Sequence, residues 1–199
     1  MRKHGFAGVA GLTVGLALTL TPPAAAQNLA DAHLSPDQRQ EFNCVSFNLS
    51  EQGRKYVAAN ALAPTPNIGA QAQAALAAGV STCQRTYYWT PTKTNLARVI
   101  ATQDAVTNAL LAILAQEDGA TNGDLVFNVW RGLSAAERAN FLPGNFNKLT
   151  TSSPILQKVR SALVAGGFPN TEQAVARAVR TMMAMTSGVR ALNDWLALG

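Results

Sequence analysis

The sequence predicts an all-α protein, and its composition, hydrophobic spacing and helix-start motifs all support this class. Alanine is frequent, as between Gln71 and Ala78, and the sustained alternation of β-branched and polar residues that is typical of strands is missing. Apolar residues recur at helical spacing instead, and several segments begin with residues that cap helices. We expect one domain over residues 35–199, a single-domain bundle of about six or seven helices with one inter-helix disulfide.

The first helix is predicted to begin at Pro36. Ser35 can cap it, proline suits the first helical position, and Gln38 completes a capping box. The helix is expected to continue past Gly53 toward Leu62, where a Pro-Thr-Pro sequence ends it. One face then carries Phe42, Val45 and Leu49.

Two long helices are predicted next. The first extends over residues 67–87, with an apolar stripe formed by Ile68, Ala72, Leu76, Val80, Cys83 and Tyr87. Thr90 and Pro91 are typical of a cap and a first turn, and the helix that they begin is expected to end near Gln116. Its apolar stripe comprises Leu96, Val99, Ile100, Val106, Leu110, Ile113 and Leu114.

Shorter helices are expected after a polar loop at residues 118–123. One covers the apolar residues of 125–130, and a second begins at a capping box formed by Ser134 and Glu137 and is stopped by Pro143. A further helix begins at residues 153–154 and is closed by two glycines at 166–167. The last helix begins at Asn170 or Thr171 and runs almost to the C-terminus, with an apolar face of Val175, Val179, Met182, Val189, Leu192 and Leu196.

Residues 1–26 are typical of a cleavable secretory signal. Two basic residues at positions 2–3 precede an apolar run over residues 6–20, and three alanines at 24–26 supply the small residues of a cleavage site. The run is interrupted by glycines and is shorter than the roughly 20 apolar residues that span a bilayer, which disfavours a retained anchor. We expect cleavage after Ala26, a flexible lead over residues 27–34, no transmembrane segment after signal cleavage, and a periplasmic or secreted protein.

The two cysteines, Cys44 and Cys83, are expected to form a disulfide. An even number of cysteines is typical of exported proteins, and the chain-entropy model assigns about 4 kcal/mol to a closed loop of about 40 residues. The alternatives are buried free thiols or a metal site. Because there is no Cys-x-x-Cys spacing and no nearby histidine, a metal site is disfavoured. The bridge would link the first predicted helix to the helix at 67–87.

No metal or cofactor is expected. The polar loop at 118–123 partly fits a calcium loop, but Ala120 and Val129 stand where oxygen ligands are required. We interpret it as a turn in which Asn122 or Asp124 caps the next helix. Once the signal is removed, His33 is the only histidine left, which disfavours histidine-based catalysis.

An aromatic run, Tyr87-Tyr88-Trp89, is one candidate for a binding surface. Three consecutive side chains at a helix end cannot all face the core, so at least one is expected to be exposed and available to a ligand or protein. Packing of these rings over the disulfide is the commoner arrangement for such residues.

The charge distribution suggests a second candidate surface. Residues 131–199 contain eight basic and three acidic residues, whereas residues 27–130 contain six basic and eight acidic ones. Arg177, Arg180 and Arg190 are expected to point away from the apolar face of the last helix. This asymmetry favours an anionic surface or another envelope protein as partner, with an ordinary solvated face as the alternative. Nucleic acid is not expected, because no dense Lys/Arg cluster is present.

One short internal similarity relates residues 34–42 to residues 133–141. Both have the pattern Leu-Ser-x-x-Gln/Glu-Arg-x-x-Phe, and their starts are 99 residues apart. A duplicated helical unit would produce this pattern, but so would two independent capped helices, and we favour the second interpretation.

The sequence does not identify an activity. Serine-hydrolase, zinc-protease and phosphate-loop motifs are missing, so we expect a non-enzymatic binding, inhibitory or structural module of the cell envelope. The alternative is a carboxylate-dependent enzyme that acts on cell-wall glycan, since that chemistry needs only two carboxyl groups. Four glutamates are candidates by residue type alone: Glu41, Glu51, Glu117 and Glu137.

Overall fold

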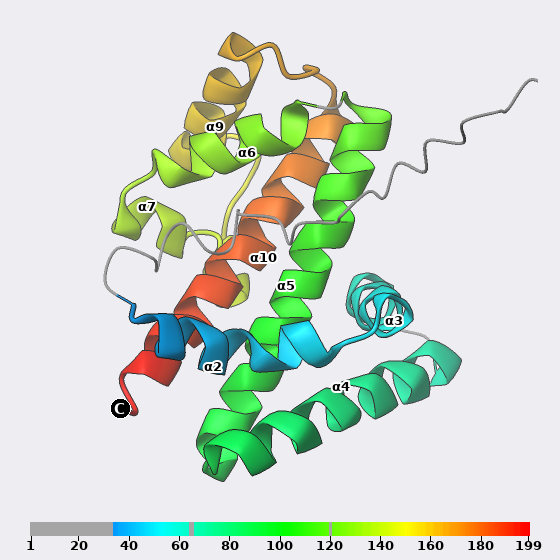
Figure 1. The fold of residues 1–199 in the computed structure, drawn as a ribbon. Helices are drawn as coiled ribbons and strands as arrows, with labels where there is room; N and C mark the ends of the chain where they lie inside the picture. The colour runs from blue at the N-terminus through cyan, green and yellow to red at the C-terminus, as the bar shows by residue number, and fades with distance from the viewer. Residues whose placement is uncertain (1–33, 64–65, 120) are drawn as a thin grey trace, which may run out of the picture.

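Two long antiparallel helices, α5 (Pro91–Glu117) and α10 (Glu172–Leu196), lie side by side through the middle of the molecule (Figure 1). The coordinates are a computed structural model that describes residues 34–63, 66–119 and 121–199. These residues form nine helices and no strand, which confirms the all-α class. The expected signal at 1–26 and most of the expected lead at 27–34 lie outside the described residues.

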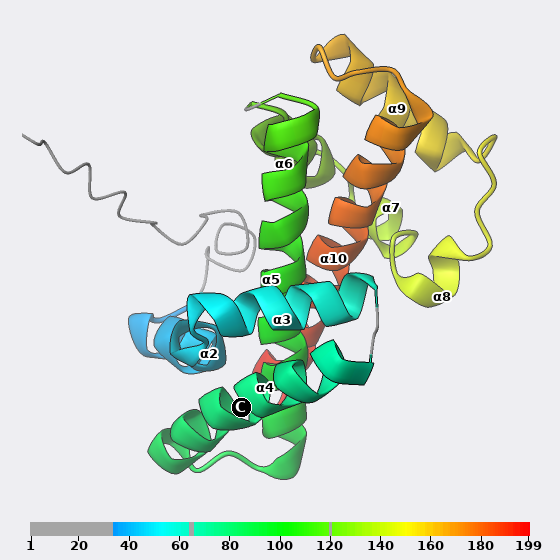
Figure 2. The same ribbon diagram turned by 90° about the vertical axis from the view of Figure 1, so that its right-hand side faces the viewer.

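The N-terminal helices pack around one half of α5. These are α2 (Pro36–Asn48), α3 (Glu51–Leu62) and α4 (Pro66–Tyr87), and Figure 2 shows all three crossing the same half of the long helix. A buried cluster at their contact contains Val45, Val80 and Trp89 beside the cysteines. These three helices therefore form one side of the bundle.

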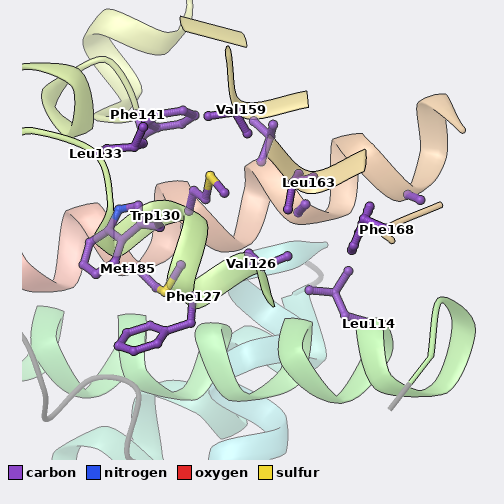
Figure 3. Close-up of a cluster of buried hydrophobic side chains, with 14 residues drawn as sticks. Leu114, Val126, Phe127, Trp130, Leu133, Phe141, Val159, Leu163, Phe168 and Met185 are labelled. Atoms are coloured by element: carbon purple, nitrogen blue, oxygen red, sulfur yellow. The ribbon is translucent and has the colours of Figure 1, made fainter. Parts of the chain in front are cut away.

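The remaining helices lie along α10. They are α6 (Asn122–Arg131), α7 (Ala135–Ala139), α8 (Pro143–Phe146) and α9 (Pro154–Ala165). The largest described buried cluster joins α6, α9 and α10 with the end of α5. Figure 3 shows Trp130 and Met185 at one end of this cluster and Leu114 and Phe168 at the other.

The single helix expected from Pro36 to Leu62 is wrong, because the chain breaks at residues 49–50. Leu49 has an extended backbone with ψ 124° and its side chain is buried. Ser50 then caps a new helix by accepting a hydrogen bond from the Gly53 amide at 3.0 Å. The break lets α3 turn away from α2 and cover a different part of α5.

The break at residues 49–50 and the separate helix α8 explain why the described residues contain more helices than the six or seven expected. Pro143 does not end a helix but occupies the first turn of α8, while α7 has already ended at Ala139. In addition, Leu34, the last residue of the expected flexible lead, is buried with Phe42 and Trp195. The domain therefore begins at least one residue before Ser35.

Both expected capping boxes are present. At the start of α2, the Ser35 hydroxyl accepts a hydrogen bond from the Gln38 amide and the Gln38 side chain accepts one from the Ser35 amide. Ser134 and Glu137 form the same pair of bonds in α7. The helices that they begin have 13 and 5 residues respectively. The two segments therefore share a capped helix start and differ in the length of the helix that follows.

One helix of the described residues, α5, is long and apolar enough to cross a membrane by length and composition. The core helix of a bundle meets the same two conditions, and α5 is packed against α2, α3, α4, α6 and α10. The expectation that no transmembrane segment follows the signal stays a prediction.

Candidate functional site

A small cavity lies where α2, α5, α6 and α10 meet. Its volume is about 40 Å³, and its walls are mainly apolar. We call it the inner cavity, and it is lined by Phe42, Asn43, Ile100, Gln103, Asp104, Thr107, Trp130, Ala184, Met185, Gly188, Val189 and Leu192.

Gly188, in the middle of α10, lines the inner cavity at a point where α10 and α5 approach closely. A β-carbon at this position would lie 3.4 Å from the Cβ of Gln103, which is an ordinary van der Waals contact. Glycine costs about 1 kcal/mol relative to alanine inside a helix. A side chain larger than that of alanine at position 188 would therefore have to displace Gln103 or occupy part of the inner cavity.

The Trp130 side chain forms a fixed wall of the same cavity. It is almost fully buried, and its indole Nε1 donates a hydrogen bond to the hydroxyl of Thr186 at 3.0 Å. That hydroxyl in turn donates to the carbonyl of Met182 at 2.8 Å. Because both polar groups have partners, the ring is held in one orientation against α10.

A wider hollow lies beside the inner cavity, between α7 and α10. Its volume is about 430 Å³, and Trp130 and Val189 line both spaces. We call it the outer hollow; its other lining residues are Ala135, Arg138, Ala139, Leu142, Thr186, Arg190, Asn193 and Asp194. The two spaces are neighbours that share these two residues as wall, and we call them together the groove.

Two arginines and one aspartate give the outer hollow its charge. The Arg138 guanidinium lies over the Trp130 ring at 5.3 Å from its centroid. Arg190 is exposed, and its Nε is 3.7 Å from an Asp194 carboxylate oxygen. The lining side chains of this hollow thus carry one more positive than negative charge.

The inner cavity contains one carboxyl group, that of Asp104. Burial raises the pKa of this group, and the nearby positive charge of Arg54 opposes the shift in part. Asn108 donates a hydrogen bond to the carboxylate at 3.5 Å. Among the lining residues of the inner cavity no second carboxyl group faces it, so the cavity does not hold the acidic pair that glycan hydrolysis requires.

The four glutamates that the sequence offered as catalytic candidates are engaged elsewhere. The bond from Lys158, together with the bonds of the Ser134 cap, lowers the pKa of Glu137 to about 2. None of the four lines the inner cavity or the outer hollow. Each lies within 4 Å of a cationic side chain, in the pairs Glu41–Lys93, Glu51–Lys55, Glu117–Arg177 and Glu137–Lys158.

The aromatic run is split between the core and the surface. Trp89 is buried and donates a hydrogen bond from Nε1 to Glu41 at 2.7 Å. Tyr87 stacks on Trp89 with ring centroids 5.9 Å apart, whereas Tyr88 is 90% exposed. Packing near the disulfide thus accounts for two of the three rings.

The three arginines of α10 have different surroundings. Arg177 is paired with Glu117 at 2.8 Å and with Asp118 at 2.6 Å, and the bond with Asp118 raises the pKa of the guanidinium. Arg180 is exposed. Arg190 lines the outer hollow. The structure therefore does not bring the three together, and only Arg190 belongs to the groove.

The polar loop at 118–123 is tied to α10. Arg177 binds both carboxylate oxygens of Asp118, and the Asn122 side-chain amide donates to the Asp118 carbonyl. The expectation that Asn122 or Asp124 caps α6 is wrong, because the residue before α6 is Thr121 and makes no side-chain cap. Over the residues that the structure describes, no group of three or more His, Cys, Asp or Glu side chains could hold a metal.

The predicted disulfide is confirmed. Cys44 and Cys83 are bonded, with their α-carbons 5.8 Å apart, and the bridge joins α2 to α4. Asn48 covers it, with its amide donating to the Cys44 carbonyl at 2.9 Å. A disulfide is compatible with a location outside the cytoplasm.

Comparison of the chain with protein-family models, with curated proteins and with solved structures found no match. The groove is therefore described from its own geometry. Sequence reasoning did not place Trp130, Arg138 or Gly188 in a site. The one available signal was Gly188, a glycine inside a helix with a strong apolar pattern. Such a glycine often has a packing or functional role, but the sequence does not show which residues lie next to it.

Proposed function

We propose that the protein is a non-enzymatic binding module that works outside the cytoplasm. The observation that carries this proposal is the groove, in which an apolar cavity lies beside a hollow with two arginines. Concave, mainly apolar sites with a few polar groups are typical of ligand binding. The fixed ring of Trp130 gives the groove a wall that does not need to be ordered when a ligand binds.

Two features support a place in the periplasm or outside the cell. The first 26 residues have the three parts of a secretory signal, and the disulfide would be kept oxidised in such a compartment. Expression of the full chain in a bacterial host tests this part of the proposal. We expect the periplasmic or culture fraction to contain a protein that begins at Gln27 and has no free thiol. A cytoplasmic protein that retains Met1 or Arg2 would contradict it.

The carboxylate-dependent enzyme is less well supported. The four candidate glutamates have cationic partners, and the inner cavity contributes one carboxyl group. A glycosidase needs two carboxyl groups on opposite sides of the scissile bond. The structural arrangement therefore favours binding over glycan hydrolysis.

Native mass spectrometry of the mature, oxidised protein tests the binding function. The protein would be incubated with separated lipid, glycan and protein fractions of a bacterial envelope. We expect a mass adduct that is lost in Gly188→Leu, which adds a large side chain to the wall of the inner cavity, and retained in Arg180→Gln, an exposed arginine outside the groove. If no fraction gives an adduct, or if Gly188→Leu retains it, the groove is not the binding site.

A further inference from the structure

We infer that the groove binds a single-chain amphiphile with an anionic headgroup, such as an acyl or alkyl chain that ends in a carboxylate or a phosphate. This inference rests on the proposed binding function and names its ligand class. The end of the chain would lie in the inner cavity and the headgroup in the outer hollow.

The size and lining of the inner cavity favour a chain end. Its apolar walls include Phe42, Ile100, Met185 and Leu192. An apolar cavity known to hold benzene has a volume of about 150 Å³, several times the 40 Å³ of this space, which favours a narrower group than a ring. The narrow end of a hydrocarbon chain fits such a space and gains from the removal of its surface from water.

The shared walls favour a ligand that extends from one space into the other. Trp130 and Val189 are the two residues that line both the inner cavity and the outer hollow. In the proposed complex, a chain whose end lies in the inner cavity passes these two side chains to reach the outer hollow. The volume of about 430 Å³ there leaves room for a headgroup and its water.

The charges of the outer hollow favour an anion. The guanidinium of Arg138 lies over Trp130, and a stacked guanidinium presents its N–H groups at its edge, where carboxylates and phosphates bind. Arg190 is held by Asp194 at 3.7 Å in an exposed pair. Such exposed pairs contribute little to stability, so an anionic headgroup can displace Asp194.

The carboxyl group of Asp104 fixes the orientation of the ligand. Asp104 lines the inner cavity and not the outer hollow. An anionic group in the inner cavity would lose its water against mainly apolar walls and would meet a carboxyl group instead of a cation, which disfavours binding in the reverse direction. The headgroup therefore belongs at the arginines.

Calorimetric titration with a matched set of ten-carbon amphiphiles tests the inference. The probes are decanoate, decyl phosphate, decyltrimethylammonium and decyl maltoside, each kept below its micelle concentration. We expect the two anionic probes to bind at least tenfold more tightly than the cationic and neutral ones. The ratio between decanoate and decyl phosphate then shows which headgroup the site prefers. Equal affinities for all four probes would overturn the inference.

Variants assign the two parts of the groove. The double variant Arg138→Gln/Arg190→Gln is expected to lower the affinity for both anionic probes at least tenfold, whereas Arg180→Gln, on the same helix but outside the groove, leaves it unchanged. Gly188→Leu is expected to abolish binding, and Gly188→Ala, which fits with ordinary contact, to weaken it less. If the arginine pair can be replaced without loss, the headgroup assignment is wrong.

The ligand class and the binding function can fail separately. If no amphiphile binds but an envelope fraction gives an adduct that Gly188→Leu removes, the groove is a binding site for another class of molecule. An adduct with protein fractions alone would point to an aliphatic side chain of a partner in the inner cavity and would overturn the amphiphile. If neither experiment shows binding, both proposals are wrong.

Discussion

At the level of single residues, Tyr88 is the most unusual position among the described residues. It is the one described non-glycine residue with a positive φ, of 53°, and its ring is 90% exposed. The Tyr88 amide bonds to the Gln84 carbonyl at 2.9 Å, which ends α4 in the manner that glycine normally provides. The neighbouring Trp89 is fixed by burial and by its bond to Glu41, so the chain has to turn here.

Replacement of Tyr88 by glycine is expected to stabilise the protein by about 0.5–1 kcal/mol. Glycine adopts positive φ without the steric cost of a side chain, and the exposed ring contributes little packing. Tyr88→Ala is the matched control, because it removes the ring but retains a β-carbon. Urea unfolding of the three proteins provides the measurement. If the glycine variant is no more stable than the alanine variant, the backbone is not strained at this position.

Glu41 is a second residue whose role follows from its contacts. Its carboxylate accepts the Trp89 indole bond at 2.7 Å and lies 3.6 Å from the ammonium group of Lys93. Lys93 also lies over the Trp195 ring and donates to the Gly199 carbonyl, so Glu41 is part of a contact between α2, α5 and α10.

The variant Glu41→Ala is expected to lower the free energy of unfolding by about 1–3 kcal/mol, because the buried indole N–H of Trp89 then lacks a hydrogen-bond acceptor. Glu41→Gln is expected to cost less, since the amide oxygen can still accept that bond. Thermal and urea unfolding measure both effects. Equal losses in the two variants would show that the charge, and not the indole hydrogen bond, determines the stability.

At the level of helices, local signals predicted starts better than ends and breaks. Ser35 and Thr90 were correctly identified as starts, and Thr171 was one of the two residues expected to begin the last helix, because a cap depends on side chains within three positions. The break at Leu49 was missed because the apolar pattern continues across it. Whether the helix breaks at this point depends on the burial of Leu49 against α4 and α5, which come much later in the sequence.

The candidate site was less predictable than the helices. The groove combines residues from α2, α5, α6, α7 and α10, and no local pattern specifies which faces of these helices meet. Arg190 was identified as polar and outward-facing, but its placement beside Trp130 and Arg138 depends on how α7 packs on α10. The aromatic run was only partly informative, since the same residues serve the core and the surface.

The cap of α7 predicts a pH dependence. The bond from Lys158, with those from Ser134, lowers the pKa of Glu137 to about 2 from a usual value of 4.5. A carboxyl group whose pKa is lower in the folded than in the unfolded protein stabilises the fold at pH values above the unfolded pKa. This stabilisation is lost as the pH falls from about 4.5 to about 2. The segment from α7 to α9 is therefore expected to loosen in acid.

Glu137→Gln tests this dependence. The amide can still accept the Ser134 backbone bond, but it cannot titrate or pair with Lys158. We expect the wild type to be more stable than Glu137→Gln near pH 7, and the difference to shrink as the pH falls from 4.5 to 2. Urea midpoints measured across this range provide the test. A difference that is constant with pH would exclude Glu137 as the titrating group.

At the level of the whole molecule, the disulfide and the groove lie in different parts of the same helix bundle. The bridge joins α2 to α4 on one half of α5, whereas Trp130 and the outer hollow belong to α6, α7 and α10. Phe42 connects them, because it is on α2, close to Cys44, and also lines the inner cavity. The stability of α2 is thus expected to affect the inner cavity more than the outer hollow.

Removal of the bridge in the double variant Cys44→Ala/Cys83→Ala is expected to lower the free energy of unfolding by about 4 kcal/mol. The two cysteines are 39 residues apart, and release of a loop of this length raises the entropy of the unfolded chain. The largest buried cluster contains neither cysteine, so the variant is expected to fold with near-native helix content. Urea unfolding, circular dichroism and titration with decanoate together measure these effects.

The decanoate titration shows what happens to α2 in this variant. If α2 remains in place, the affinity for decanoate is unchanged. If α2 detaches, the affinity falls while the environment of Trp130 persists. Loss of the whole fold would instead show that the two halves of the molecule do not retain structure independently of the bridge.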